Sequence, residues 1–379
     1  MIQNVVIISD FCYVEGGASK VAIDSAEGLA KRGYHVFFLT PSLSKMSALS
    51  DKVVLVSSEQ GECLKYKNKI AGLFNQVKNK KFYHLVCNEL SKLDNKNTVV
   101  HVHSWTKCCS AYFFKAIEKL GFRCFLTLHD YFKICPNGAL FNFRKCKCCR
   151  LKPGSLRCIL SNCDSRNFLY KVVRILRHSS YKKWIRGNYL SIICVSSFQR
   201  KLLPGVSANI LENPVDIPNA FCAQKEYDFA FVGRTDREKG FDLFLRAAQK
   251  YPGHRFILIG KTKDVLPSNV DSSGWVSEDK VNDLLSRCKS IILPSLWPET
   301  FGLNAVKAAA MGIAVIVSNN TASAELIREY EKAFIFNQGD FFSMETKINE
   351  FLRASYSSEK YAYKNEYFEK LDRLYQNGI

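Results

Sequence analysis

The fold is decided by residues 291–325, which read IILPSLWPETFGLNAVKAAAMGIAVIVSNNTASAE. We predict a buried strand at 291–293, a polar loop, a helix at 303–311 and a second buried strand at 314–317. Apolar strands separated by one helix are typical of a parallel sheet, whose ligands lie beyond the C-terminal ends of the strands. The loop offers the carboxylate of Glu299 and then a helix N-terminus, whose free N–H groups suit a phosphate.

A cationic turn precedes this stretch. A strand at 228–232 runs into Gly233 and Arg234, and Lys239 follows at the start of a helix. An arginine binds two phosphate oxygens at once, whereas a lysine acts as a point charge. Together with the loop around Glu299, this turn predicts a diphosphate site.

These motifs resemble the donor-site signature of the retaining nucleotide-sugar glycosyltransferases of family 4 (group 1), of the bacterial polysaccharide and lipopolysaccharide type. The resemblance rests on PSLWPETFGL, on AxxxGIAVIVSN with Glu325 beyond it, and on the Gly-Arg and Lys of the cationic turn. It implies the GT-B fold, in which two Rossmann-like domains with parallel sheets face each other and a C-terminal helix crosses back to the first. The chain departs from the family where a second Glu is expected, because that position is Lys307.

The resemblance also implies the domain boundaries. An acceptor-binding domain is expected at 1–205, with a cysteine-rich insertion at 130–165. The donor-binding domain is expected at 206–355, and the helix that crosses back at 356–379.

The implied reaction transfers a sugar, with retention, from a nucleotide diphosphate sugar to a hydroxyl of a lipid-linked glycan. The expected catalytic residues are His129, Glu299, Arg234 and Lys239. The expected donor-binding residues also include Gly233, Trp275, Val276, Thr300, Phe301, Gly302, Leu303 and Lys307. No catalytic metal is expected, because the cations stabilise charge on the leaving diphosphate. Two alternatives stay open: a catalytically impaired nucleotide-sugar-binding protein, for which Lys307 argues, and a GT-B sugar epimerase.

The first half of the chain offers glycines and histidines for an acceptor site. Gly16 and Gly17 precede a helix, and they form either a tight turn or a loop that approaches a ligand. Two strands end in histidine, at His101 and His103 and at His129 followed by Asp130, so these rings converge if the sheet is parallel. Taken singly, each histidine is more often structural; His129 with Asp130 matches the family's histidine near the transferred sugar.

Six of the 15 cysteines fall between residues 135 and 163. The start of the chain is not typical of a signal peptide, so we expect a cytosolic protein with reduced thiols. A thiol cluster in a reducing compartment favours a structural zinc site, and the remaining interpretation is reduced or redox-active thiols. The candidate ligands are Cys135, Cys146, Cys149, Cys158 and Cys163.

The positive charge is concentrated in the first half. Residues 1–200 hold 32 Lys and Arg against 12 Asp and Glu, a net of +20, and the other residues have a net of −1. Residues 166–187 contain seven basic residues and no acid, with an apolar stripe that includes Leu169, Tyr181 and Trp184. This helix suits an anionic membrane surface or packs on its own domain. We expect peripheral attachment to the inner face of the cell membrane and, since no nucleic-acid motif is present, no nucleic-acid partner.

Overall fold

Two parallel sheets organise the computed structural model, which describes residues 1–60, 69–218, 224–355 and 360–377. The chain divides into two compact units. Unit 1 comprises 1–138, 151–214 and 365–379, and unit 2 comprises 139–150 and 215–364. Residues 139–150 therefore belong with unit 2, whereas we expected the whole cysteine-rich segment in the first domain. Parts of the predicted donor-binding domain and of the predicted C-terminal segment, at 219–223, 356–359 and 378–379, lie outside the described residues.

The sheet of unit 1 has the strand order β3-β2-β1-β4-β5-β8-β9, and all its pairs are parallel. Its strands are β1 (Asn4–Ile8), β2 (His35–Thr40), β3 (Val53–Ser57), β4 (Thr98–Val102), β5 (Arg123–Leu128), β8 (Leu190–Cys194) and β9 (Asn209–Ile210). The helices of this unit are α1 (Gly17–Lys31), α2 (Lys69–Val77), α3 (Lys80–Leu90), α4 (Phe114–Lys119), α5 (Leu156–Leu160), α6 (Phe168–Trp184), α7 (Ser197–Lys201) and α13 (Tyr367–Asn377), with short 3-10 turns η1 (Ser44–Met46) and η3 (Ala111–Phe113).

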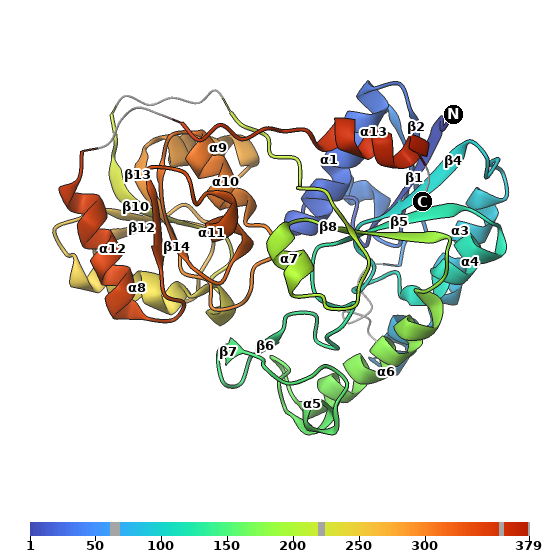
Figure 1. Cartoon of the computed structure of the whole chain (residues 1–379), viewed down its shortest axis with the longest axis horizontal. Helices are drawn as coiled ribbons and strands as arrows, with labels where there is room; N and C mark the ends of the chain where they lie inside the picture. The colour runs from blue at the N-terminus through green and yellow to red at the C-terminus, as the bar shows by residue number, and fades with distance from the viewer. Residues whose placement is uncertain (61–68, 219–223, 356–359, 378–379) are drawn as a thin grey trace. The chain divides into compact units, whose positions relative to one another are not determined.

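The last helix, α13, packs on the first elements of the chain (Figure 1). Tyr367, Leu371 and Tyr375 are buried in the same core as β1 and α1. A Cβ on Gly28 of α1 would lie 1.9 Å from the ring of Phe368, so the two helices approach closely because residue 28 is a glycine. The amide of Ile2 donates to the side chain of Gln376 at 3.0 Å. The two ends of the chain therefore stabilise one unit.

The sheet of unit 2 has the order β12-β11-β10-β13-β14-β15 and is also parallel. Its strands are β10 (Tyr227–Val232), β11 (Phe256–Ile259), β12 (Val270–Ser272), β13 (Cys288–Leu293), β14 (Ala314–Ser318) and β15 (Ala333–Phe336). The helices are η4 (Arg237–Lys239), α8 (Phe241–Lys250), α9 (Glu278–Ser286), α10 (Leu303–Ala310), α11 (Ala322–Leu326) and α12 (Phe341–Arg353). A small antiparallel hairpin, β6 (Phe141–Asn142) with β7 (Lys147–Cys148), completes the unit.

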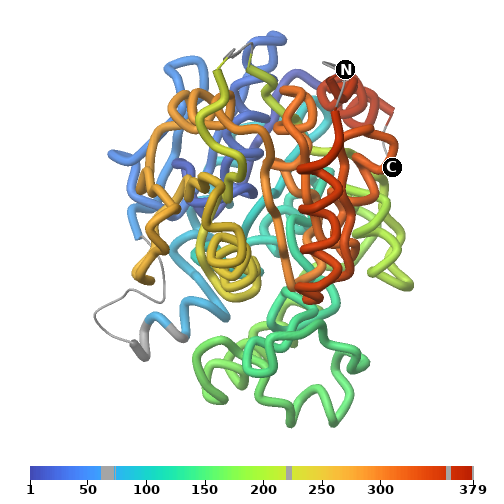
Figure 2. Tube along the Cα trace, turned by 90° about the vertical axis from the view of Figure 1, so that its left-hand side faces the viewer, coloured from blue at the N-terminus to red at the C-terminus, as the bar shows by residue number. Residues whose placement is uncertain are grey.

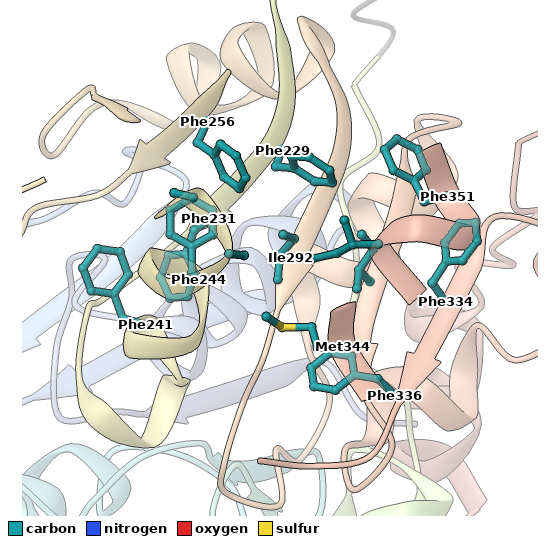
Figure 3. Packing of buried hydrophobic residues seen from close by; sticks show 14 of the residues in the cluster. Phe229, Phe231, Phe241, Phe244, Phe256, Ile292, Phe334, Phe336, Met344 and Phe351 are labelled. Atoms are coloured by element: carbon teal, nitrogen blue, oxygen red, sulfur yellow. The ribbon is translucent and has the colours of Figure 1, made fainter. Parts of the chain in front are cut away.

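Phenylalanines fill the space between this sheet and the helices α8 and α12. Phe229 stacks on Phe256 with ring centroids 4.8 Å apart, and Phe244 meets Phe256 edge to face. Figure 3 shows these rings converging with Phe351 of α12. In Figure 2 helix α8 (yellow) is seen end-on. The rings fix α8, and therefore the turn before it, against the sheet.

The predicted strands at 291–293 and 314–317 and the helix between them are confirmed as β13, β14 and α10. One prediction is wrong in part. The apolar stripe expected along 166–187 does not lie on one face of α6: Tyr181 is buried and stacks on Trp105 at 4.6 Å, whereas Leu169 is 73% exposed. The part of the chain that the structure describes contains no helix both long and apolar enough to cross a membrane.

Candidate functional site

The loop that joins β13 to α10 carries the carboxylate predicted to contact a sugar. Glu299 accepts a hydrogen bond from Ser295 Oγ at 3.2 Å and forms an ion pair with Lys239. The following residues, Thr300 and Phe301, are buried. Gly302 has φ 86, and a Cβ there would lie 2.7 Å from that of Ser323. Glycine is therefore required at 302, because the loop enters α10 through a left-handed residue in close contact with α11.

The cationic turn after β10 lies against this loop. Gly240, which follows Lys239, has φ 73, and a Cβ there would lie only 1.9 Å from the carbonyl oxygen of Pro294. The amide of Leu296 donates to the carbonyl of Glu238 at 2.8 Å. These contacts place Lys239 beside Glu299, so the structure brings together two side chains that are 60 positions apart in the sequence.

Arg234 lies on the same turn but is more exposed. Its side chain is 58% exposed, and its guanidinium lies 2.6 Å from Asp236 and 3.9 Å from Glu238. Burial raises the pKa of the Glu238 carboxyl. Each of the two residues predicted to bind phosphate is thus paired with a carboxylate: Arg234 with that of Asp236, and Lys239 with that of Glu299. A bound anion would compete with these carboxylates for the two cations.

A surface hollow of about 330 Å³ opens beside this turn. Trp275, predicted to line a nucleobase site, contributes to its wall and is 66% exposed, while Val276 is half-buried. The wall is completed by Thr235, Lys261, Thr262, Lys263 and Asp264.

The lysines of this wall are absent from our sequence predictions. A signal for them exists, because Gly260-Lys261 follows β11 as Gly233-Arg234 follows β10. A Cβ on Gly260 would lie 2.2 Å from the carbonyl oxygen of Gly233, so the two turns lie side by side. Lys261 and Lys263 thus extend the cationic edge of the sheet.

Lys307, the departure from the family pattern, faces the interior of unit 2. Its ammonium donates to Glu278 Oε1 at 2.7 Å and to Asn282 Oδ1 at 3.1 Å, and the side chain is 8% exposed. Both partners lie on α9. The ammonium of Lys307 is therefore paired with an acid of the same unit.

The β6–β7 hairpin supplies a thiol to the same unit. Cys148 Sγ lies 3.4 Å from the carbonyl oxygen of Leu296 and 3.3 Å from Gln338 Oε1, and it accepts from Asn320 Nδ2. Burial raises the pKa of this thiol. The hairpin is thereby bonded to the loop that carries Glu299, a contact that sequence reasoning missed.

In unit 1 the three predicted histidines gather, and one of them, His101, is held by two hydrogen bonds. Both ring nitrogens of His101 are occupied: Nδ1 lies 2.6 Å from the Tyr375 hydroxyl and Nε2 lies 2.7 Å from Thr127 Oγ1. The ring is fully buried, and burial lowers its pKa to about 3. His101 therefore has a structural role.

His103 and His129 form a neutral pair. Nδ1 of His103 lies 3.2 Å from Nε2 of His129, and the rings stack at 5.5 Å. Burial lowers the pKa of His129 to about 4 and lowers the pKa of His103 well below its usual value, so each ring carries one proton at neutral pH. Burial also raises the pKa of the neighbouring Asp130 to about 7. A neutral His129 can donate one hydrogen bond without bringing a positive charge to a ligand.

The Gly16–Gly17 turn has no steric need for glycine at residue 16. Gly16 is extended at φ 169, and a Cβ there would meet no atom within 4 Å. Gly17 opens α1, where the hydroxyl of Ser19 accepts from the amide of Gly16 at 3.1 Å. The interpretation of this turn as a ligand loop stays a prediction.

The predicted zinc ligands are divided between the two units. Cys146 and Cys149 belong to unit 2, whereas the other three belong to unit 1. In unit 1 Asn137 bridges Cys135 at 3.0 Å and Cys163 at 3.4 Å, and Cys158 is buried. Within the described ranges no three His, Cys, Asp or Glu side chains are placed to hold a metal ion.

The zinc site stays a prediction. Elemental analysis of protein purified without chelator should give about one zinc per chain, because four-thiolate sites contribute directly to folding. Replacing Cys146 and Cys149 by serine should abolish the metal, while replacing Cys288, buried in unit 2 and outside the cluster, should leave it. A folded preparation without zinc would reject the prediction.

Comparison with known proteins gives a family match that lies mainly in unit 2. Residues 216–368, which are 153 of the 379, match the family model described as "Glycosyl transferases group 1". An uncharacterized 42.6 kDa protein in the cps region of Klebsiella pneumoniae is 26% identical over 248 residues, which are 62% of this chain and 61% of that protein. The chain thus spans about three fifths of that relative's length.

Solved structures match over nearly the whole chain. WaaG, a glycosyltransferase involved in lipopolysaccharide biosynthesis, has a TM-score of 0.63 with 15% identity and covers 99% of this chain and 100% of its own. Alr3699/HepE of Anabaena, in complex with UDP, has a TM-score of 0.62 with 15% identity, covering 92% and 90%. The fold is GT-B. The match to the group 1 glycosyl transferase model lies mostly in unit 2, and the loop with Glu299 and the turn with Arg234 and Lys239 both lie inside the matched residues.

Proposed function

We propose that this chain is a retaining, metal-independent glycosyltransferase. It transfers a sugar from a nucleotide diphosphate sugar to a hydroxyl of a lipid-linked glycan in cell-surface polysaccharide synthesis. The observation that carries the proposal is the contact of Lys239 with Glu299. It brings a residue expected to bind the diphosphate next to a residue expected to bind the sugar, beyond the C-terminal ends of the strands of one parallel sheet. Relatives support it: one is encoded in a cps region, and a protein of the same fold is in complex with UDP.

In the proposed reaction, different residues stabilise the leaving group, bind the base and bind the donor sugar. Arg234, Lys239 and the free N–H groups at the start of α10 face the charge that develops on the leaving diphosphate, usually the largest catalytic contribution. Trp275 stacks on the base in the hollow beside them. Glu299 binds hydroxyls of the donor sugar, and the neutral His129 donates a hydrogen bond to that sugar.

Turnover with a panel of nucleotide sugars tests the proposal. With a lipid-linked acceptor, one donor should release its nucleoside diphosphate, and the anomeric configuration of the product should match that of the donor. Binding of a donor without release would instead indicate an impaired binding protein. Conversion of the donor sugar without any acceptor would indicate an epimerase.

A further inference from the structure

The first turns of helix α6 expose apolar side chains and bury charged ones. Its solvent face carries Leu169, Val172 and Leu176, which are 73%, 39% and 57% exposed. Its inner face carries Lys171 and Arg177, which are 0% and 7% exposed. A helix at the surface of a globular protein normally shows the reverse arrangement, with the apolar face toward the core.

The inner cations are held within unit 1, so α6 is fixed in this orientation. Lys171 Nζ lies 3.1 Å from Cys163 Sγ. Arg177 donates to the carbonyl of Thr106 at 2.6 Å, and its guanidinium lies over the ring of Phe132. Turning α6 to bury its leucines would break the bonds of Lys171 and Arg177. This is unfavourable, because a buried cation is stable only when it is bonded.

Helix α5 also exposes apolar side chains. Leu156 and Leu160 are 72% and 65% exposed, whereas Cys158 of the same helix is buried. In Figure 1 α5 lies beside the first turns of α6. Of the 17 exposed large apolar side chains in the described residues, seven fall between positions 156 and 176: Leu156, Ile159, Leu160, Phe168, Leu169, Val172 and Leu176. We call these seven the apolar face.

The charges around the apolar face have one sign. Between residues 151 and 187 the single acid is Asp164, which is buried and paired with Arg174. The exposed charged residues of the same segment are all basic: Lys152, Arg157, Arg166, Lys182, Lys183 and Arg186.

We propose that the apolar face and its basic rim dock unit 1 on an anionic lipid bilayer. The apolar side chains enter below the headgroups, and the cations meet the lipid phosphates. A second copy of this chain fits less well, because a two-fold interface would bring the basic rim against itself. The choice of a lipid surface rests on the proposed function, in which the acceptor is lipid-linked, but the geometry of α6 does not.

Co-sedimentation with vesicles tests the docking in the absence of donor and acceptor. The full chain should bind phosphatidylcholine vesicles that contain one quarter phosphatidylglycerol, should not bind phosphatidylcholine alone, and should dissociate as salt rises. Lys182→Gln with Lys183→Gln should weaken binding about thirty-fold, because each cation near an anionic leaflet strengthens binding about five-fold. Lys360→Gln with Lys364→Gln, two exposed lysines of unit 2, should change little.

The contribution of the apolar side chains to vesicle binding is tested with a second variant and its control. Leu169→Gln with Leu176→Gln should weaken vesicle binding at least about ten-fold through lost apolar burial. Val265→Gln with Phe342→Gln, which are 95% and 77% exposed in unit 2, should leave it unchanged. All four variants change exposed side chains and should keep the circular dichroism of the parent.

Three results would overturn the docking: no binding to anionic vesicles, equal binding to both vesicle types, or leucine variants that bind like the parent. Concentration-dependent dimers that the leucine variants abolish, without vesicle binding, would assign the apolar face to a second copy. Nucleoside diphosphate release on a water-soluble acceptor is measured separately. If vesicle binding is absent but nucleoside diphosphate is released, the docking is wrong and the proposed function stands. If vesicles are bound but no nucleoside diphosphate is released, the docking stands and the proposed function does not.

Discussion

Lys307→Glu should lower the melting temperature of unit 2 by about 4–12 °C, which corresponds to a destabilisation of about 2–3 kcal/mol in a domain of this size. The new carboxylate would lie against Glu278, at the place where the ammonium now donates at 2.7 Å. Breaking a fully buried ion pair costs more, but Glu278 is 36% exposed, so water compensates part of the loss. Thermal unfolding followed by circular dichroism measures the change.

Charge reversal controls this prediction. Glu278→Lys alone should also destabilise, since two ammonium groups would then face Asn282. The double variant should recover most of the loss, because the pair is restored with opposite polarity. If Lys307→Glu melts like the parent, the contact with Glu278 does not stabilise the unit.

Donor affinity of the folded double variant then addresses the family resemblance, in which a Glu at this position accepts hydrogen bonds from the ribose. An ammonium cannot accept them. A gain in affinity would show that Lys307 limits ribose binding. Unchanged affinity and turnover would place the position outside the donor site.

Most of the sheet architecture and the donor loop could be predicted from the sequence because both depend on local pattern. Apolar runs such as Ile291–Leu293 form buried parallel strands, and the glycine at 302 marks the left-handed entry into α10. The C-terminal ends of parallel strands share one edge of the sheet, so the cationic turn and the loop with Glu299 were expected together. Their contact through Lys239 confirms that they lie together.

The features that escaped prediction depend on partners distant in the sequence. The acid that binds Lys307 lies 29 positions earlier, on another helix, and no periodicity marks it. The orientation of α6 is the clearest example. Its pattern is amphipathic, but Cys163 and Thr106 hold its cations inward, and an apolar stripe alone cannot show which face a domain buries.

The second large effect is expected at the diphosphate. Arg234→Ala should weaken binding of UDP by about 1.5–3 kcal/mol, or roughly ten- to 150-fold, because hydrogen bonds between charged groups are lost. Arg234 is exposed, and its aspartate partner lies on the same turn, so removing it should leave the fold intact. Isothermal titration of the full chain with UDP, ADP and GDP measures the change and also identifies the base.

Arg255→Ala is the matched control. Arg255 is 60% exposed and binds Asp271 at 3.1 Å, as Arg234 binds Asp236, but it precedes β11 whereas Arg234 follows β10. In a parallel sheet these positions lie at opposite ends of the strands, so Arg255→Ala removes the same charge from unit 2 without changing the C-terminal ends. An equal loss of UDP affinity in both variants would show that the effect comes from net charge alone. An unchanged affinity in Arg234→Ala would exclude that arginine from the donor site. A loss confined to Arg234→Ala would locate the diphosphate at the turn that Gly240 holds against Pro294.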